Sequence, residues 1–268
     1  MAPPLDLRGK DRLIVALDVP THERALALVD RLDNVSFFKV GLELLLAGDL
    51  YALLRNLQAR RPQNGGVFVD LKLGGDIGNT IASMIRQLQT LNVKFLTLVE
   101  SVPSAITLKS VKAGREARGD AADPKLLMVP FLSSLDEGDL RESGIVDVDV
   151  DSYIVQRARV MLGAGCDGLI VSGRAIQVCR QNFPDVVLVS PGIRPAWASA
   201  DDQKRITTPY EAIEFGADYL VVGRPVTRAD DPRDAAEKII VEIDRALDAR
   251  PGSSGAPFIA SQPRRFAS

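Results

Sequence analysis

The sequence predicts an α/β protein that folds as a single-domain (β/α)8 barrel, or TIM barrel. Three observations favour this fold: short apolar runs rich in β-branched residues that recur eight times, segments of helical spacing between them, and a length of 268 residues, which suits one undivided barrel. An open doubly wound sheet is the structural alternative. It is disfavoured because the first apolar run is not followed by the GxGxxG pattern that binds dinucleotides in such sheets.

The predicted strands are apolar along almost their whole length, as parallel strands are when they are buried on both faces. In chain order they occupy residues 12–18, 35–40, 67–72, 94–99, 126–132, 168–172, 186–190 and 218–222. We expect the barrel domain to span residues 1–249. The segment 250–268 is rich in small and polar residues, proline and glycine, and is expected to form a flexible tail.

The segments between the strands carry helical patterns and helix-end signals. In residues 77–91 one apolar stripe recurs at steps of three and four, formed by Ile77, Ile81, Met84, Ile85 and Leu88. Thr208 and Glu211 have the spacing of a capping box, and Gly216 stands where a helix C-terminal cap belongs. The pair 231–232, Asp-Pro, is typical of a helix start and predicts the last helix.

The composition favours a small polar ligand over a nucleic acid or a membrane. The formal charge is −2 and the pI is about 5.6, which gives no general attraction to polyanions. Cys166 and Cys179 lack the spacing of metal ligands and are expected to be reduced thiols. No uncharged stretch approaches the roughly 20 residues of a membrane span, so we expect a soluble, cytoplasmic protein.

Charged side chains are predicted to meet at one rim of the barrel. Asp18, Lys39, Asp70 and Lys72 lie at the ends of the first three predicted strands, and Asp76 follows closely. Because Asp70 and Lys72 are two residues apart, both point toward the barrel mouth in an extended strand. A structural salt-bridge network is the alternative for any one of them. Opposite charges at several corresponding strand ends favour a functional site instead.

A second polar group is predicted after the last two strands. Gly223 and Arg224 end the eighth strand, where backbone N–H groups and a guanidinium can meet a phosphate. The preceding loop, residues 191–205, offers Arg194 and Gln203 as further donors. The alternative for an isolated Gly-Arg pair is a turn with a solvated charge. Its place on the eighth loop favours a ligand with an anionic tail.

Several segments together resemble the orotidine 5′-monophosphate decarboxylase family. The resemblance covers most of residues 12–247, in the order of the family. It is carried by 14-IVALDVP-20, 37-FFKVGLELL-45, 69-VDLKLGGDIGNT-80, 190-SPGIRP-195 with Asp202 and Gln203, and 216-GADYLVVGRPVTRADDP-232.

The resemblance implies removal of CO2 from orotidine 5′-monophosphate to give uridine 5′-monophosphate, the last step of pyrimidine synthesis, with no metal and no organic cofactor. It implies that Lys72 donates a proton to C6 of the pyrimidine and that Asp70 lies beside the departing carboxylate. Lys39 is expected to hold the charges in register and to contact the ribose.

The resemblance also implies roles for residues outside this centre. Asp18 resembles the ribose ligand, and Ser133 resembles the contact to the pyrimidine edge. The implied phosphate ligands are Arg194, Gln203, Gly223 and Arg224. The element that the family gives to the neighbouring subunit's site is represented by Asp76, Ile77 and Thr80, which implies a homodimer with shared active sites.

Two departures from the family pattern keep alternatives open. The Asp-x-Lys-x-x-Asp-Ile element is one residue longer here, and we expect Gly74 and Gly75 to absorb the excess as a bulge or tight turn. The histidine that the family tends to carry after the fourth strand is absent from 96-LTLVESVP-103. The alternatives are a nucleotide-binding relative without turnover, and another phosphate-binding barrel that acts as a decarboxylase or aldolase on a sugar phosphate.

Overall fold

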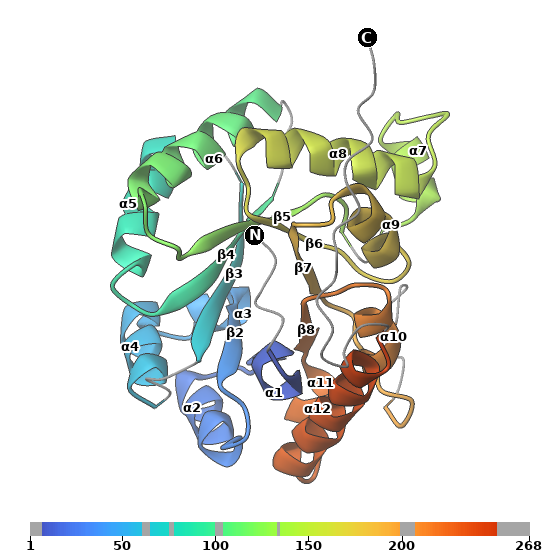
Figure 1. Ribbon diagram of the computed structural model, residues 1–268. Coiled ribbons are helices and arrows are strands. Elements are labelled where there is room, and N and C mark those ends of the chain that lie inside the picture. Colours follow the sequence, from blue (N-terminus) through green and yellow to red (C-terminus); the bar gives the residue numbers. More distant parts are fainter. Residues whose placement is uncertain are drawn as a thin grey trace.

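The strands form a closed parallel barrel in sequential order, and β8 pairs with β1 (Figure 1). The computed structural model describes residues 7–60, 65–74, 78–99, 104–132, 135–198 and 207–250. Within these residues the barrel strands are β1 (Leu13–Ala16), β2 (Phe37–Gly41), β3 (Gly66–Gly74), β4 (Val93–Val99), β5 (Lys125–Val129), β6 (Gly168–Ile170), β7 (Val187–Ser190) and β8 (Tyr219–Val222). Each predicted strand is therefore present, and the (β/α)8 barrel is confirmed.

Helices surround the strands as an outer layer (Figure 1). They are α1 (Gly9–Arg12), α2 (His22–Arg31), α3 (Leu42–Leu45), α4 (Leu50–Arg60), α5 (Gly78–Leu88), α6 (Ser104–Arg118), α7 (Glu137–Glu142), α8 (Val150–Ala164), α9 (Ala175–Asn182), α10 (Pro209–Glu214), α11 (Arg224–Thr227) and α12 (Pro232–Asp248). The predicted end signals of α10 and α12 are confirmed. Thr208 and Glu211 form a capping box, Gly216 has φ +105°, and the Asp231 carboxylate accepts hydrogen bonds from the first turn of α12.

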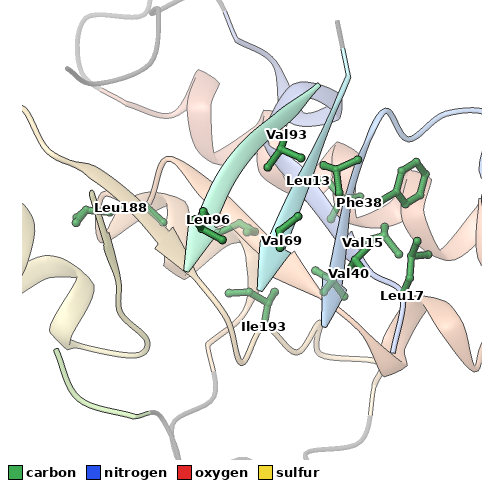
Figure 2. Packing of buried hydrophobic residues seen from close by; sticks show 14 of the residues in the cluster. Leu13, Val15, Leu17, Phe38, Val40, Val69, Val93, Leu96, Leu188 and Ile193 are labelled. Carbon is green, nitrogen blue, oxygen red and sulfur yellow. The ribbon is translucent and has the colours of Figure 1, made fainter. Parts of the chain in front are cut away.

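The hydrophobic core has two layers, separated by the strands. The outer layer lies between strands and helices; Figure 2 shows part of it, with residues such as Val15, Val40 and Val69. The inner layer fills the barrel and contains the aromatic rings of Phe37, Phe95 and Tyr219. Alternate residues of each strand enter the two layers, which follows from the two-residue period of a β-strand.

The strand β3 carries an irregularity that sets the position of the predicted lysine. Val69 pairs with Leu96 and Leu73 pairs with Leu98, so four steps along β3 match two steps along β4. Lys72 has φ +48°, a left-handed conformation that is uncommon outside glycine. We expected Gly74 and Gly75 to absorb the extra residue. The register shift that the structure describes precedes Gly74, which pairs with Val99. Gly75 lies outside the described residues, so the expected turn at Gly74 and Gly75 stays a prediction.

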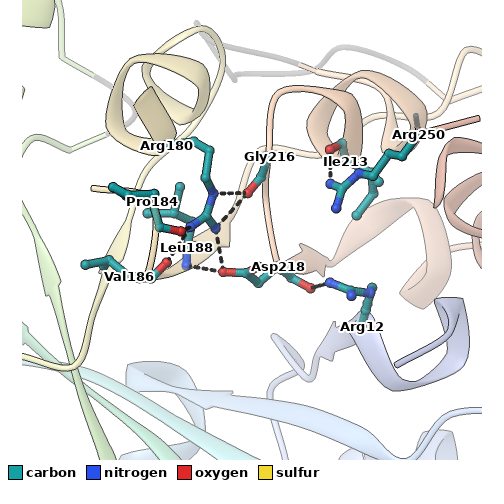
Figure 3. Close-up of polar contacts among 9 residues, drawn as sticks. All are labelled: Arg12, Arg180, Pro184, Val186, Leu188, Ile213, Gly216, Asp218 and Arg250. Carbon is teal, nitrogen blue, oxygen red and sulfur yellow. Dashed lines mark hydrogen bonds and ion pairs between the residues drawn. The ribbon is translucent and has the colours of Figure 1, made fainter. Parts of the chain in front are cut away.

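A buried ionic cluster lies at the amino-terminal end of the strands (Figure 3). The Asp218 carboxylate, directly before β8, accepts hydrogen bonds from Arg180 Nη2 at 2.7 Å and from the Leu188 backbone N–H at 2.8 Å. Arg180 also donates to the carbonyl oxygens of Pro184, Val186 and Gly216. Arg12 donates to the Asp218 carbonyl oxygen at 3.0 Å. Because catalytic groups of such barrels gather at the opposite end, we assign this cluster to stability.

The thiols, an acidic segment, the length of the helices and the C-terminal segment complete the description of the fold. Cys166 and Cys179 are free and buried, and burial raises the pKa of the Cys179 thiol to about 12. The acidic segment 135–152 is largely exposed but contains the short helix α7, which Asp136 caps. The helices that the structure describes include none that could cross a membrane. The predicted tail 250–268 lies outside the described residues apart from Arg250.

Candidate active site

A cavity of about 510 Å³ opens at the carboxyl-terminal ends of the strands. Its floor is the top of the inner core layer, where Phe68, Ile170 and Val221 line it. Its charged walls are formed by Asp18, Lys39, Glu43, Asp70, Lys72, Arg194, Arg224 and Arg228. An apolar floor below a ring of charged side chains suits a ligand with a flat apolar face and polar edges.

Two lysines and two carboxylates form a continuous chain at the β1–β3 side of this cavity. Lys39 Nζ lies 3.0 Å from Asp18 Oδ1 and 3.3 Å from Asp70 Oδ2. Lys72 Nζ lies 3.0 Å from Asp70 Oδ2 and 3.1 Å from Oδ1. The predicted convergence of these four strand-end residues is therefore observed. Asp70 stands at the centre of the chain, between two ammonium groups.

The bulge in β3 accounts for the close contact between Asp70 and Lys72. Four residues of a regular strand advance about 13 Å, whereas the two facing steps of β4 advance about 7 Å. The segment from Val69 to Leu73 is thus compressed along the barrel axis, and Asp70 and Lys72 are held at similar depth. The side chain of Lys72 is 41% exposed and reaches the open cavity, whereas that of Asp70 is 10% exposed.

The surroundings of Asp70 and Lys39 keep both groups charged. Burial alone would raise the pKa of Asp70, but the ammonium groups of Lys39 and Lys72 and the hydrogen bonds from Lys72 and Thr97 hold it below its ordinary value. Burial likewise opposes the charge on Lys39, but the carboxylates of Asp18 and Asp70 raise its pKa above the ordinary value. The site therefore presents fixed charges of both signs at neutral pH.

Two residues of this centre were missed by the sequence reasoning. Thr97 on β4 donates its hydroxyl to Asp70 Oδ1 at 2.8 Å and is fully buried. It was detectable because it follows Phe95 by two residues and is therefore a polar residue on the otherwise apolar inward face of the strand. Gly41, at the end of β2, makes room for the charges, because a Cβ there would lie 3.2 Å from both Asp18 Oδ1 and Lys39 Nζ.

The wall of the cavity that follows β7 and β8 carries the predicted anion ligands. Gly223 and Arg224 follow β8, and Arg194 follows β7; all three line the cavity. Arg194 is buried, and its Nη1 donates to the Ile193 carbonyl oxygen at 2.9 Å. Arg228, which the sequence reasoning did not select, adds a third guanidinium one turn beyond Arg224. This side of the cavity is cationic and suits a phosphate.

Ser172 is a further polar residue that the sequence reasoning missed. It follows β6, lines the cavity and is 3% exposed. Its position at a strand end, two residues beyond the inward-facing Ile170, was the available signal. Across the described part of the chain, no cluster of three or more histidine, cysteine or carboxylate side chains is arranged to hold a metal ion.

The remaining predicted site residues are not placed in this cavity. Thr80 lies in the first turn of α5, is exposed, and does not line the cavity of its own chain. Asp76, Ile77, Ser133 and Gln203 lie outside the described residues. Their roles stay predictions.

The fold and the cavity define a (β/α)8-barrel enzyme with a lysine–carboxylate centre and a cationic wall. The comparison with known families then gives the particular one. The chain belongs to the family described as "Orotidine 5'-phosphate decarboxylase / HUMPS family", whose model matches residues 11–239.

Individual relatives agree with this assignment. An orotidine 5′-phosphate decarboxylase of Rhodopseudomonas palustris (strain BisB5) is 45% identical over 243 residues, which are 90% of this chain and 98% of the relative. One of Methylobacterium sp. (strain 4-46) is 42% identical over 242 residues, with the same shares covered. The crystal structure of the Lactobacillus acidophilus decarboxylase has a TM-score of 0.71 at 29% identity, over 87% of this chain and 98% of that one.

Proposed function

We propose that this chain decarboxylates orotidine 5′-monophosphate to uridine 5′-monophosphate in pyrimidine biosynthesis, with Lys72 as the proton donor. The observation that carries the proposal is the Lys72–Asp70 pair at 3.0 Å in the mouth of a cavity that Arg194 and Arg224 also line. Relatives that are 42–46% identical and match at least 90% of this chain, all named orotidine 5′-phosphate decarboxylase, support the same reaction.

The chemical step needs one proton and a stabilised carbanion. The bond between C6 and the carboxylate carbon breaks, CO2 leaves, and the electron pair stays on C6. Lys72 then donates a proton from its ammonium group to C6, which gives the product, and it regains a proton from solvent. Because the ammonium is fixed beside C6 before charge develops there, it stabilises the transition state more than the ground state.

Asp70 supplies the opposing charge in this scheme. Its carboxylate is held ionised by two lysines and would face the carboxylate of the bound substrate. The two negative charges repel each other until CO2, which is neutral, departs. Asp70 thus raises the energy of the bound ground state relative to the transition state, while Lys39 keeps Asp70 and Asp18 in place.

The cationic wall is assigned to the phosphate of the nucleotide. Arg194, Arg224 and Gly223, together with Gln203, are the proposed phosphate ligands, and Asp18 is proposed to bind the ribose. Binding energy from the phosphate, which is remote from C6, can contribute to stabilising the transition state at C6. Ser133 is proposed to contact the pyrimidine edge.

We also propose that the enzyme is a homodimer with shared active sites. The helix α3, directly after the site strand β2, exposes Leu42 and Leu45, and Leu46 follows it with 90% exposure. Exposed leucines at the rim of the cavity favour a covered surface. A partner chain lying on this rim could bring its Asp76, Ile77 and Thr80 to the site. We further propose a cytoplasmic location, in keeping with the two free thiols.

The experiment that tests the reaction follows the loss of orotidine 5′-monophosphate absorbance on addition of the purified protein. Lys72→Ala should abolish turnover. A matched control is Lys94→Ala, because the Lys94 side chain is 40% exposed and pairs with Asp123 at 2.8 Å, but lies at the start of β4, far from the strand ends that carry the site. The control should retain activity.

The same experiment separates the alternatives. Tight binding of uridine 5′-monophosphate without turnover would indicate a nucleotide-binding relative that is not an enzyme. The absence of both binding and turnover would refute the proposal. A sugar-phosphate decarboxylase or aldolase is disfavoured because these relatives, matched over nearly their whole length, are named orotidine 5′-phosphate decarboxylase.

A further inference from the structure

A fully buried hydroxyl lies against the central carboxylate of the site. Thr97 stands on β4, two residues beyond Phe95 and on the same inward face, and its Oγ1 lies 2.8 Å from Asp70 Oδ1. Thr97 does not line the cavity. It therefore contacts the carboxylate from behind, on the side away from any ligand.

The hydrogen bonds of Asp70 divide between its two oxygens. Oδ2 faces Lys39 at 3.3 Å and Lys72 at 3.0 Å, whereas Oδ1 accepts from Thr97 at 2.8 Å and from Lys72 at 3.1 Å. Thr97 and Lys39 each hold one oxygen, and they come from the strands on either side of β3. Together they fix the plane of the carboxylate.

The division of the hydrogen bonds between the two Asp70 oxygens matters when Lys72 donates its proton. In the proposed function, Lys72 must turn from Asp70 toward C6 of the pyrimidine, and both of its contacts to Asp70 then lengthen. The contacts of Asp70 to Thr97 and Lys39 do not depend on that movement. A threonine on a strand is also stiff at χ1, so its hydroxyl direction is well defined.

We infer that Thr97 is a positioning residue for Asp70, which keeps the carboxylate oriented toward the substrate carboxylate while Lys72 acts as the proton donor. This inference rests on the proposed function. It assigns to Thr97 an effect on the chemical step and none on nucleotide affinity, because uridine 5′-monophosphate has no carboxylate for Asp70 to face.

The test compares Thr97→Val, which removes the hydroxyl at nearly constant shape, with Thr97→Ser, which keeps it. We expect kcat of Thr97→Val to fall about 10- to 100-fold, as for loss of a hydrogen bond to a charged group, with unchanged Kd for uridine 5′-monophosphate. Thr97→Ser should restore kcat to within about threefold of the original protein. Ser110→Ala, which removes a buried hydroxyl without a hydrogen-bond partner among the described residues, is the control and should keep kcat.

Two outcomes would overturn the inference: an unchanged kcat in Thr97→Val, or an equal loss of product affinity and kcat, which indicates general damage to the site. If Thr97→Val does not fold, the ratio of kcat between Thr97→Ser and Thr97→Ala decides the question, and a ratio near one refutes the positioning role. Failure of the unsubstituted protein to decarboxylate the substrate would instead refute the proposed function, so the two failures are distinguishable.

Discussion

Removal of the Lys39 ammonium should destabilise the protein in a manner that depends on pH. Lys39→Met leaves Asp18 and Asp70 without the cation that lies 3.0 and 3.3 Å from them. Loss of one partner from a buried ion pair typically costs about 3–5 kcal/mol. Because the Asp18 side chain is half exposed and Lys72 still neutralises Asp70, we expect the lower end, about 3 kcal/mol.

The sign of the pH dependence follows from Asp70. In the unsubstituted protein the pKa of Asp70 lies below its ordinary value, so its ionised form adds stability that is lost only as pH falls through that lowered pKa. In Lys39→Met, burial acts with less opposition and the pKa of Asp70 rises. The stability difference between the two proteins should therefore be largest at neutral pH and shrink as the solution becomes acidic, because Asp70 takes up a proton at a higher pH in the variant than in the unsubstituted protein.

Urea unfolding at about pH 7 and about pH 4 measures this difference. Lys238→Met is the control, because Lys238 forms an exposed pair with Asp234 and should change the free energy of unfolding by less than about 0.5 kcal/mol. A loss under about 1 kcal/mol at neutral pH, or a loss equal at both pH values, would refute the electrostatic reasoning.

Three further predictions concern the other parts of the molecule. Arg224→Ala should weaken binding of uridine 5′-monophosphate but leave that of uridine unchanged in calorimetry, while Arg233→Ala, at an exposed pair, should bind both normally. Arg180→Ala should lower the free energy of unfolding by about 3 kcal/mol, since Asp218 loses its buried partner, with normal kcat in the folded fraction; a smaller kcat would contradict a purely stabilising cluster. Light scattering should give twice the chain mass of 29.0 kDa, and Leu46→Asp should yield monomers with lower activity.

Much of the fold could be predicted because its signals are local. Buried parallel strands are apolar throughout, and caps such as Thr208 with Glu211 depend on neighbouring residues only. The strand-end charges could be predicted for the same reason, since in this barrel every strand ends at the same rim. Asp18, Lys39, Asp70 and Lys72 converge as the pattern indicates.

The features that were missed depend on contacts between distant segments. The register shift in β3 is defined by its pairing with β4, which spacing within β3 does not reveal. Arg180 and Asp218 are 38 residues apart, so no local pattern in the sequence indicates that they pair. Thr97 was overlooked because a single threonine in a strand is common. Only its hydrogen bond to Asp70, which the structure shows, connects it with the site.

The left-handed backbone at Lys72 limits how this centre can be transferred to another scaffold. Such a conformation costs a non-glycine residue about 1–2 kcal/mol, so the surrounding barrel must impose it. A designer who copied only the Asp-x-Lys letters onto a regular strand would obtain the same side chains at different heights, without the compression that brings amine and carboxylate together. The unit to transplant is the irregular strand together with its neighbour β4, since Asp70 and Lys72 alone would not reproduce the geometry.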